Sequence, residues 1–137
     1  MAKDIFHDLV KTGLQAEGWI ITAYPYRLEF DRVKFEVDLA AERVIAAERE
    51  NDKIAVEIKS FLNASAITDF YGALGQFLSY RLALETLEPE RILYLAIPLD
   101  SYSQFFQSTF AQLAISKYAL KLIVYDSEKG GLVKWIN

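Results

Sequence analysis

The chain has 137 residues, of which 53% are apolar and 25% are charged, with a formal net charge of -4, one His and no Cys. This length and composition fit one globular domain, and the missing Cys excludes zinc fingers, iron–sulfur clusters, thiol nucleophiles and disulfide frameworks. A multi-histidine metal site or a Ser-His-Asp hydrolase would have to use His7 alone, and the acidic balance argues against a protein that holds nucleic acid over its whole surface.

The N-terminus is charged within four residues and lacks the apolar segment of a signal peptide. No apolar run approaches the roughly 18 residues that a membrane-spanning helix needs. The sequence also shows no Gly/Ser-rich linker, no repeat and no tail of like charges. We therefore expect one domain over residues 1–137, a cytoplasmic location and no contact with a membrane.

Hydrophobic spacing predicts the elements of the N-terminal half. Residues 3–17 form an amphipathic pattern that predicts a helix ending near Gly18, and a short strand at 19–22 is followed by a break at 24–26. Residues 33–39 alternate strictly between apolar and polar side chains, which predicts a strand that residues 44–47 extend. Turn-forming residues at 50–52 precede a second run at 53–59, so the two runs predict an antiparallel hairpin.

The C-terminal half predicts two longer helices and three strands. Ser65 is an expected N-cap for a helix that continues to about Leu87 and ends at Pro89. Residues 91–97 are nearly all apolar, as in a strand covered on both faces, and a helix at 100–118 and strands at 120–125 and 132–136 follow. This order of elements predicts a mixed α/β or α+β sheet covered by helices.

Charged residues on the predicted hairpin are candidates for chemistry. Because side chains alternate along a strand, Glu57 and Lys59 share the face opposite Ile58, and Asp38 occupies the polar face of the preceding strand. If these faces meet, two carboxylates and a lysine converge, which suits a hard cation such as Mg2+. Two simpler interpretations stay open: an ordinary solvated face, or an ion pair between Glu57 and Lys59 alone.

Two other groups of residues have both a functional and a structural interpretation. Gln76 and Tyr80 lie four apart on one helix face, where they either contact phosphate or a metal-bound water or form a polar edge beside the core. His7 lies at the edge of an apolar stripe and is either a ligand or a boundary histidine. The aromatic residues of the third helix are expected to be core rather than a base-stacking surface: Tyr102, Phe105, Phe106 and Phe110.

These residues resemble known families. Asp38 followed by Glu57-Ile58-Lys59 is similar to the PD-(D/E)-x-K nuclease superfamily, and residues 76–80 resemble the Q-x3-Y motif of its RecB-like branch, with His7 as an upstream His. The whole chain more closely resembles the XisH family of fdxN element excision controlling factors, known from cyanobacteria. The blocks that carry this resemblance are residues 4–7, 37–43, 54–61, 73–76 and 91–98.

The resemblance implies a restriction-endonuclease-like fold and a role in programmed excision of a DNA element, with a site-specific recombinase and an XisI-like companion protein as partners. By position, Asp38 and Glu57 would bind Mg2+ or Mn2+, with His7 as a further ligand, and Lys59 would be the catalytic lysine. Gln76 and Tyr80 would support the site, although Val37 replaces the proline of the motif. A metal-dependent nuclease and a non-catalytic regulator both remain open, and a homodimer is expected.

The predicted hairpin register raises a difficulty for this site. A turn at 50–53 places Ala46 opposite Glu57 and carries Asp38 past Lys59. The first strand would then have to bend near residues 40–41 for Asp38 to reach the others. Without such a bend, Glu42 or Glu48 would complete the site.

Overall fold

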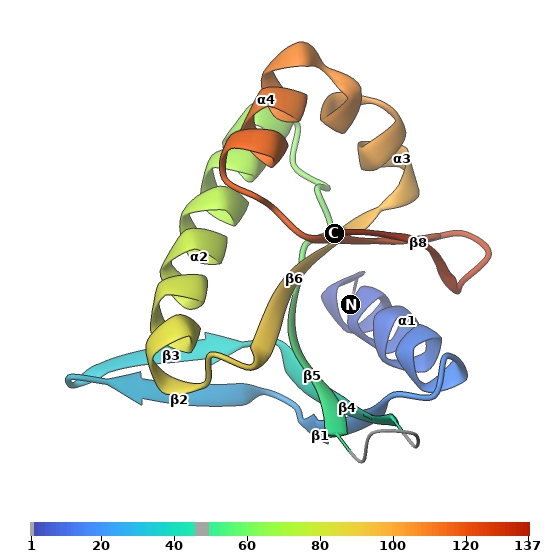
Figure 1. The fold of residues 1–137 in the computed structure, drawn as a ribbon. Coiled ribbons are helices and arrows are strands. Elements are labelled where there is room, and N and C mark those ends of the chain that lie inside the picture. Colours follow the sequence, from blue (N-terminus) through green and yellow to red (C-terminus); the bar gives the residue numbers. More distant parts are fainter. Residues whose placement is uncertain (1, 46–49) are drawn as a thin grey trace.

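The computed structural model describes residues 2–45 and 50–137 and consists of a mixed sheet between two helical layers (Figure 1). Its elements are α1 (Ala2–Ala16), β1 (Ile20–Ala23), β2 (Tyr26–Phe30), β3 (Val33–Val37), β4 (Leu39–Ile45), β5 (Glu50–Ile58), α2 (Ala66–Leu87), β6 (Arg91–Pro98), α3 (Leu99–Ser103), the 3-10 helix η1 (Phe105–Gln107), α4 (Thr109–Lys117), β7 (Leu122–Tyr125) and β8 (Leu132–Ile136).

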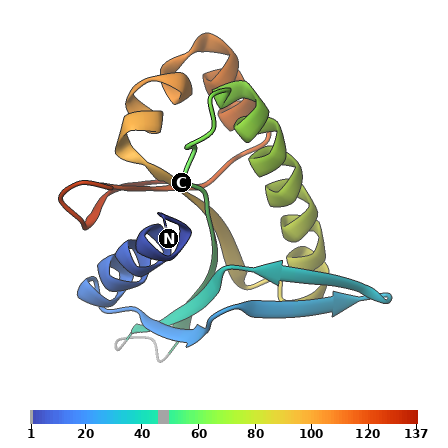
Figure 2. The same ribbon diagram turned by 180° about the vertical axis from the view of Figure 1, so that it is seen from behind.

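The central sheet has six strands in the order β1-β4-β5-β6-β7-β8. Strands β5, β6 and β7 are parallel, whereas β1, β4 and β8 pair antiparallel with their neighbours. Strands β2 and β3 form a separate hairpin that projects beside the lower end of α2 (Figures 1 and 2). The prediction of a mixed α/β or α+β sheet covered by helices is therefore confirmed.

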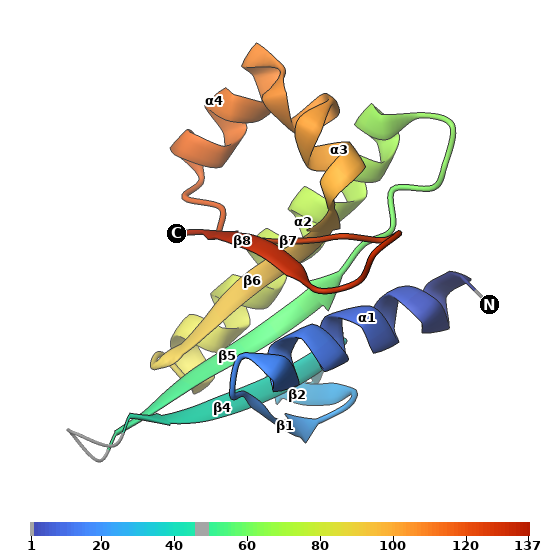
Figure 3. The same cartoon turned by 90° about the vertical axis from the view of Figure 1, so that its right-hand side faces the viewer.

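The two faces of the sheet bury separate apolar clusters. Along β6, Leu93 and Leu95 point toward α2, whereas Tyr94 and Ala96 point toward α1. Helix α1 covers one face, and α2, α3, η1 and α4 cover the other (Figure 3). Since both faces are covered, the continuous apolar run of β6 is explained.

Most boundaries predicted from the sequence are close to those observed. Helix α2 begins after Ser65, whose hydroxyl accepts the Thr68 N–H at 3.3 Å, and its C-cap residue is Glu88, directly before Pro89. Helix α1 ends one residue earlier than predicted, at Ala16. Among the described helices, none is long and apolar enough to cross a membrane.

The prediction of one strand over residues 33–39 is wrong. Val37 ends β3 and packs toward α2, whereas Leu39 begins β4 and packs toward α1. The chain changes face at Asp38, whose backbone and side chain bond to β5 rather than continuing the β3 ladder. β3 pairs instead with β2, a strand that the sequence did not predict.

The predicted register of the hairpin is also wrong, because β5 begins at Glu50 instead of residue 53. Asp52, expected in the turn, lies opposite Arg43 in the β4–β5 ladder and pairs with it at 3.2 Å. The ladder runs without interruption from Ile45 opposite Glu50 to Leu39 opposite Val56, so β4 needs no bend against β5. The predicted extension of this strand over 44–47 reaches Ile45, and its last two residues lie outside the described residues.

The single helix predicted over 100–118 is three short helices instead. Gln104 and Ser108 separate α3, η1 and α4, and Ser108 begins α4 by accepting the Ala111 N–H at 3.2 Å. As expected, Phe106 is fully buried and Tyr102 and Phe105 pack against the same cluster. Phe110 differs from this expectation, because 52% of it is exposed.

Candidate functional site

A pocket of about 430 Å3 lies where α1, the β3–β4 junction, the end of β5 and α2 meet. Asp38, Glu57 and Lys59 line it together with His7, Gln76 and Tyr80. These are the residues that the sequence nominated, with the exception of Glu42. Their convergence depends on the β4–β5 register, because that register directs the chain at Asp38 toward Glu57.

Asp38 and Glu57 hold each other in place through backbone groups. The Asp38 N–H donates to Glu57 Oε1 at 3.1 Å, and the Ile58 N–H donates to Asp38 Oδ2 at 2.7 Å. Both carboxylates are thereby anchored at the same strand crossing. A hydrogen bond from a backbone N–H group to an ionised carboxylate is stronger than a hydrogen bond between two neutral groups, so it fixes the carboxylate more firmly.

Glu57 and Lys59 share the α2 side of β5, as the alternation predicted. Lys59 Nζ lies 3.3 Å from Glu57 Oε2, and the Glu57 side chain is 7% exposed. Burial and the neighbouring Asp38 charge raise the pKa of Glu57 to about 7, against the opposing effect of Lys59. The ion pair thus only partly compensates the negative charge that is gathered in this pocket.

His7 lies beside Asp38 rather than beside Glu57. Its Nε2 is 3.6 Å from Asp38 Oδ2, and its Nδ1 is 3.3 Å from the hydroxyl of Tyr24. The imidazole is buried, because the side chain is 7% exposed. The structure therefore brings His7 to the site, on the side formed by Asp38.

Gln76 and Tyr80 face the pocket from α2, one turn apart. Gln76 Oε1 is buried and finds no hydrogen-bond partner among the described residues. Burial, followed by the charges of Glu57, Asp38 and Glu36, raises the pKa of Tyr80 to about 12. Tyr80 is therefore a protonated donor at neutral pH, and Gln76 presents an unused acceptor.

Of the two alternative acids, only Glu42 lies among the described residues, and it does not line the pocket. Glu42 lies opposite Lys53 in the β4–β5 ladder, and its Oε2 accepts from Arg91 Nη2 at 3.4 Å. Arg91 also donates to the Ile54 carbonyl and to Glu88, so the Glu42 carboxylate belongs to a buried arginine network. Glu48 lies outside the described residues.

Sequence reasoning missed two residues of this region. Glu36 lines the pocket, and its place two residues before Asp38 on the polar face of the predicted strand was a usable signal. The buried Tyr125 donates its hydroxyl to the Lys59 carbonyl at 2.8 Å. No local pattern links residues 66 positions apart, so only the packing of β7 beside β6 reveals this bond.

The side chains of this pocket fit a hard cation that is bound by only one or two protein carboxylates, rather than one that is surrounded by protein ligands. No group of three or more His, Cys, Asp and Glu residues in segments 2–45 and 50–137 is gathered closely enough to hold a metal ion. Mg2+ commonly uses only one or two carboxylates and fills its other positions with water and substrate phosphate. Asp38 and Glu57, two adjacent and incompletely neutralised carboxylates facing a pocket, match that requirement.

Comparison with known proteins gives consistent matches over nearly the whole chain. The family model described as XisH protein matches residues 1–133. An XisH family protein from Nostoc punctiforme PCC 73102 is 45% identical, with a TM-score of 0.89, and the match covers 98% of this chain and 100% of that chain. An fdxN element excision controlling factor protein from Anabaena variabilis is 46% identical, with a TM-score of 0.89, over 98% and 99% of the two chains. None of the curated proteins matches. The chain therefore belongs to the XisH family.

Proposed function

We propose that the chain is an excision controlling factor that cleaves DNA phosphodiesters in a metal-dependent reaction at Asp38, Glu57 and Lys59. The observation that carries this proposal is the convergence of two anchored carboxylates and a lysine in one pocket. The Anabaena variabilis relative is described as an fdxN element excision controlling factor, which supports a role in DNA excision. The restriction-endonuclease-like arrangement suggested by the sequence is part of the same proposal.

The residues of the chain have separate tasks in this reaction. Asp38 and Glu57 would hold Mg2+ or Mn2+, whose contribution is to polarise a phosphoryl oxygen and to activate water. Lys59, 28% exposed beside Glu57, reaches the pocket and stabilises the negative charge that develops on the phosphate. Gln76 and Tyr80 offer an acceptor and a donor on the opposite wall, where they orient water and the DNA backbone.

The test is cleavage of supercoiled, linear and single-stranded DNA with Mg2+ or Mn2+, with and without the XisI-like companion. Lys59→Met keeps the length and apolar stem of the side chain but removes the ammonium group. We expect cleavage by the wild type and a loss of about 100-fold or more in the variant, since one stabilising charge is typically worth that much. Lys117→Met, which removes an exposed ammonium group on α4 that does not line the pocket, is the matched control.

Retained cleavage in Lys59→Met would assign the activity to another site or to a contaminant. If no DNA form is cut under any of these conditions, and Mg2+ does not bind, the nuclease proposal fails. The net charge of -4, which gives no general attraction for DNA, favours a second candidate, a non-catalytic regulator that acts by binding a recombinase or the XisI-like companion. Binding of these partners by Lys59→Met with unchanged affinity, together with no cleavage by the wild type, would support that candidate.

A further inference from the structure

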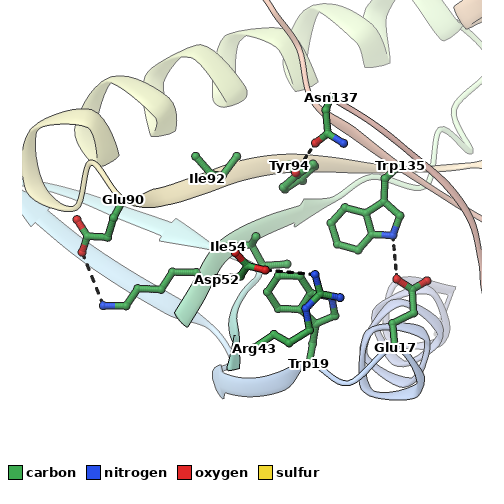
Figure 4. Close-up of a pocket in the computed structure, with 11 residues that line it drawn as sticks. Glu17, Trp19, Arg43, Asp52, Ile54, Glu90, Ile92, Tyr94, Trp135 and Asn137 are labelled. Carbon is green, nitrogen blue, oxygen red and sulfur yellow. Dashed lines mark hydrogen bonds and ion pairs between the residues drawn. The ribbon is translucent and has the colours of Figure 1, made fainter. Parts of the chain in front are cut away.

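A second pocket of about 410 Å3 opens at the other end of β5 and α1, away from Asp38 and Glu57. Ile54 of this pocket and Glu57 of the first lie three residues apart on β5, about 10 Å at roughly 3.3 Å per residue, and their side chains point to opposite faces of the sheet. Figure 4 shows its aromatic residues: Trp19 behind Arg43, Trp135 above Glu17, and Tyr94 on β6. No proposed catalytic residue contributes to it.

The described helices leave part of the apolar sheet surface open at the floor of this pocket. Helix α1 ends at Ala16, and Glu17 directly after it lines the pocket wall. Beyond this point Ile92 is 39% exposed, although it points to the same face as the buried Tyr94. Because an apolar sheet face is normally packed against another element, this part of the face is suited to a covering segment from elsewhere.

The aromatic walls are rigid and carry an unused donor. The rings of Trp19 and Trp135 stack with centroids 5.8 Å apart, and Tyr94 meets Trp135 edge to face at 4.9 Å. The indole N–H of Trp19 is buried and has no acceptor among the described residues. The Arg43 guanidinium covers this ring at 4.5 Å, and its side chain is 43% exposed.

The rim favours a basic ligand. Its three carboxylates, Glu17, Asp52 and Glu90, outnumber its two cations, and Asp52 and Glu90 already pair with Arg43 and Lys53. Glu90 remains 55% exposed. In addition, α1 has no basic residue in its last turn, so the negative end of its dipole is not compensated there.

We propose that this pocket binds a partner protein through one apolar side chain, aromatic or aliphatic, that is flanked by basic residues. The side chain packs on Ile92, Tyr94 and Trp135, and the flanking cations meet Glu17 and Glu90. A peptide carbonyl of the partner supplies the acceptor that the Trp19 N–H lacks. A second copy of this acidic chain does not fit this chemistry as well as a basic partner does. The proposal is independent of the nuclease activity, because it uses neither Asp38 nor Glu57.

The chain contains only two tryptophans, and both line this pocket, so their indole N–H signals in a nitrogen-15 NMR spectrum report directly on it. The probe is an N-acetylated, C-amidated tripeptide with phenylalanine between two arginines, added to the full chain. We expect both indole signals to shift and the peptide to bind with a dissociation constant of about 1 mM, as for weak binding through one side chain. Replacing the arginines with glutamates should weaken binding about tenfold or more, and replacing the phenylalanine with alanine should abolish it.

Four variants complete the test. Ile92→Glu should abolish the shifts, whereas Leu82→Glu, which alters an exposed apolar residue on α2, should leave them unchanged. If Ile92→Glu does not fold, Glu90→Lys provides a second measurement on the rim and should weaken binding of the arginine peptide several-fold. Asp38→Asn should bind the peptide like the wild type, which separates this inference from the proposed catalysis.

Several results would overturn the inference. These are unshifted indole signals with the arginine and phenylalanine peptide, equal shifts with the alanine peptide, or tighter binding of the glutamate peptide. Shifts caused by adenosine in place of the peptides would instead identify a nucleobase pocket and would also overturn it.

Discussion

The two carboxylates of the candidate site, Asp38 and Glu57, each accept a hydrogen bond from a backbone N–H group. Because both are negatively charged when ionised, they repel each other. The Asp38 N–H donates to Glu57, the Ile58 N–H donates to Asp38, and Lys59 places an ammonium group beside Glu57. Burial and the Asp38 charge raise the pKa of Glu57 to about 7. Without a bound cation, ionisation of this site therefore lowers the free energy of unfolding. Such a loss of stability is common at sites that serve function.

Glu57→Gln should stabilise the metal-free protein above neutral pH. Because the pKa of Glu57 in the folded chain is about 7 and its ordinary value is 4.5, stability from this group is fully present below about pH 4.5 and is lost as the pH rises through 7. The variant does not suffer this loss, so at pH 8 it should be more stable by about 2 kcal/mol, the difference shrinking below pH 5. Urea denaturation at both pH values in the presence of EDTA measures it.

Glu36→Gln is the matched control for this measurement. Its carboxylate lines the same pocket but is 62% exposed, so little change in stability is expected at either pH. A Glu57→Gln protein less stable than the wild type at pH 8 would show that the ion pair with Lys59 outweighs burial and repulsion.

Tyr125→Phe tests the bond that holds the end of β5. The buried hydroxyl donates to the Lys59 carbonyl at 2.8 Å, and removing it should cost about 1 kcal/mol of unfolding free energy. Tyr71→Phe, at a position that is 61% exposed, should change stability by much less. Equal unfolding curves for the Tyr125 variant and the wild type would mean that this bond does not anchor Lys59.

At the scale of residues, the sequence predicted the acids and the lysine but not how they meet. Alternation along β5 correctly placed Glu57 and Lys59 on one face, because that pattern is local. The position of Asp38 depends on which residues of β4 and β5 are opposite each other, and the polar residues before Lys53 suggested a turn where the strand in fact continues. For the same reason the sequence also allows Glu42 as a site residue, whereas in the structure its carboxylate contacts Arg91.

At the scale of elements, α1 packs so closely on β8 that one helix position has no room for a side chain. A Cβ atom added at Gly13 would lie 2.7 Å from Leu132 Cγ and 2.8 Å from its Cδ2. Helical propensity alone would favour alanine there by about 1 kcal/mol, so packing and propensity oppose each other at this residue. In contrast, a Cβ at Gly75 of α2 would meet no atom within 4 Å.

Gly13→Ala and Gly75→Ala should therefore change stability in opposite directions. We expect Gly13→Ala to destabilise the chain by about 1 to 2 kcal/mol, because Leu132 must move and repacking of this kind costs about 1 to 3 kcal/mol. Gly75→Ala should stabilise it by about 0.5 to 1 kcal/mol. Thermal unfolding of the two variants beside the wild type measures both effects. Stabilisation by Gly13→Ala would contradict the close packing of α1 on β8.

The elements that sequence periodicity predicted well are those with a cap or a continuous apolar run. Ser65 and Pro89 bound α2, and the apolar residues of β6 distinguish a strand that is buried on both faces. Strand β2 was missed although its residues alternate between apolar and charged side chains, because this alternation spans only five residues directly after Pro25. The helix at 100–118 was predicted as one because apolar spacing continues across Gln104 and Ser108, although Ser108 is a recognisable N-cap.

At the scale of the whole molecule, the acidic charge and the unequal covering of the sheet both bear on how partners are recognised. One face is covered by α1 alone and the other by α2, α3, η1 and α4, and the second pocket opens on the less covered face. The net charge of -4 gives no general attraction for DNA. DNA binding should therefore depend on neutralising the acidic candidate site.

DNA affinity is accordingly expected to rise when a divalent cation is added, although divalent cations usually compete with proteins for phosphate. With Ca2+ in place of EDTA at constant ionic strength, binding of a labelled duplex should tighten about tenfold, a gain of roughly 1.4 kcal/mol. Asp38→Asn should bind DNA more tightly than the wild type in EDTA and should gain little from Ca2+. Fluorescence anisotropy measures the DNA affinity of both proteins in EDTA and in Ca2+. Weaker binding by the wild type in Ca2+ than in EDTA would contradict the expectation.

The central claim is that Asp38 and Glu57 together bind a divalent cation, and calorimetric titration of the metal-free chain with Mg2+ and Mn2+ tests it most directly. We expect one binding site in the wild type, its loss in Asp38→Asn, and its retention in Glu42→Gln, whose carboxylate contacts Arg91 instead. No binding to the wild type, or equal binding to Asp38→Asn, would contradict it.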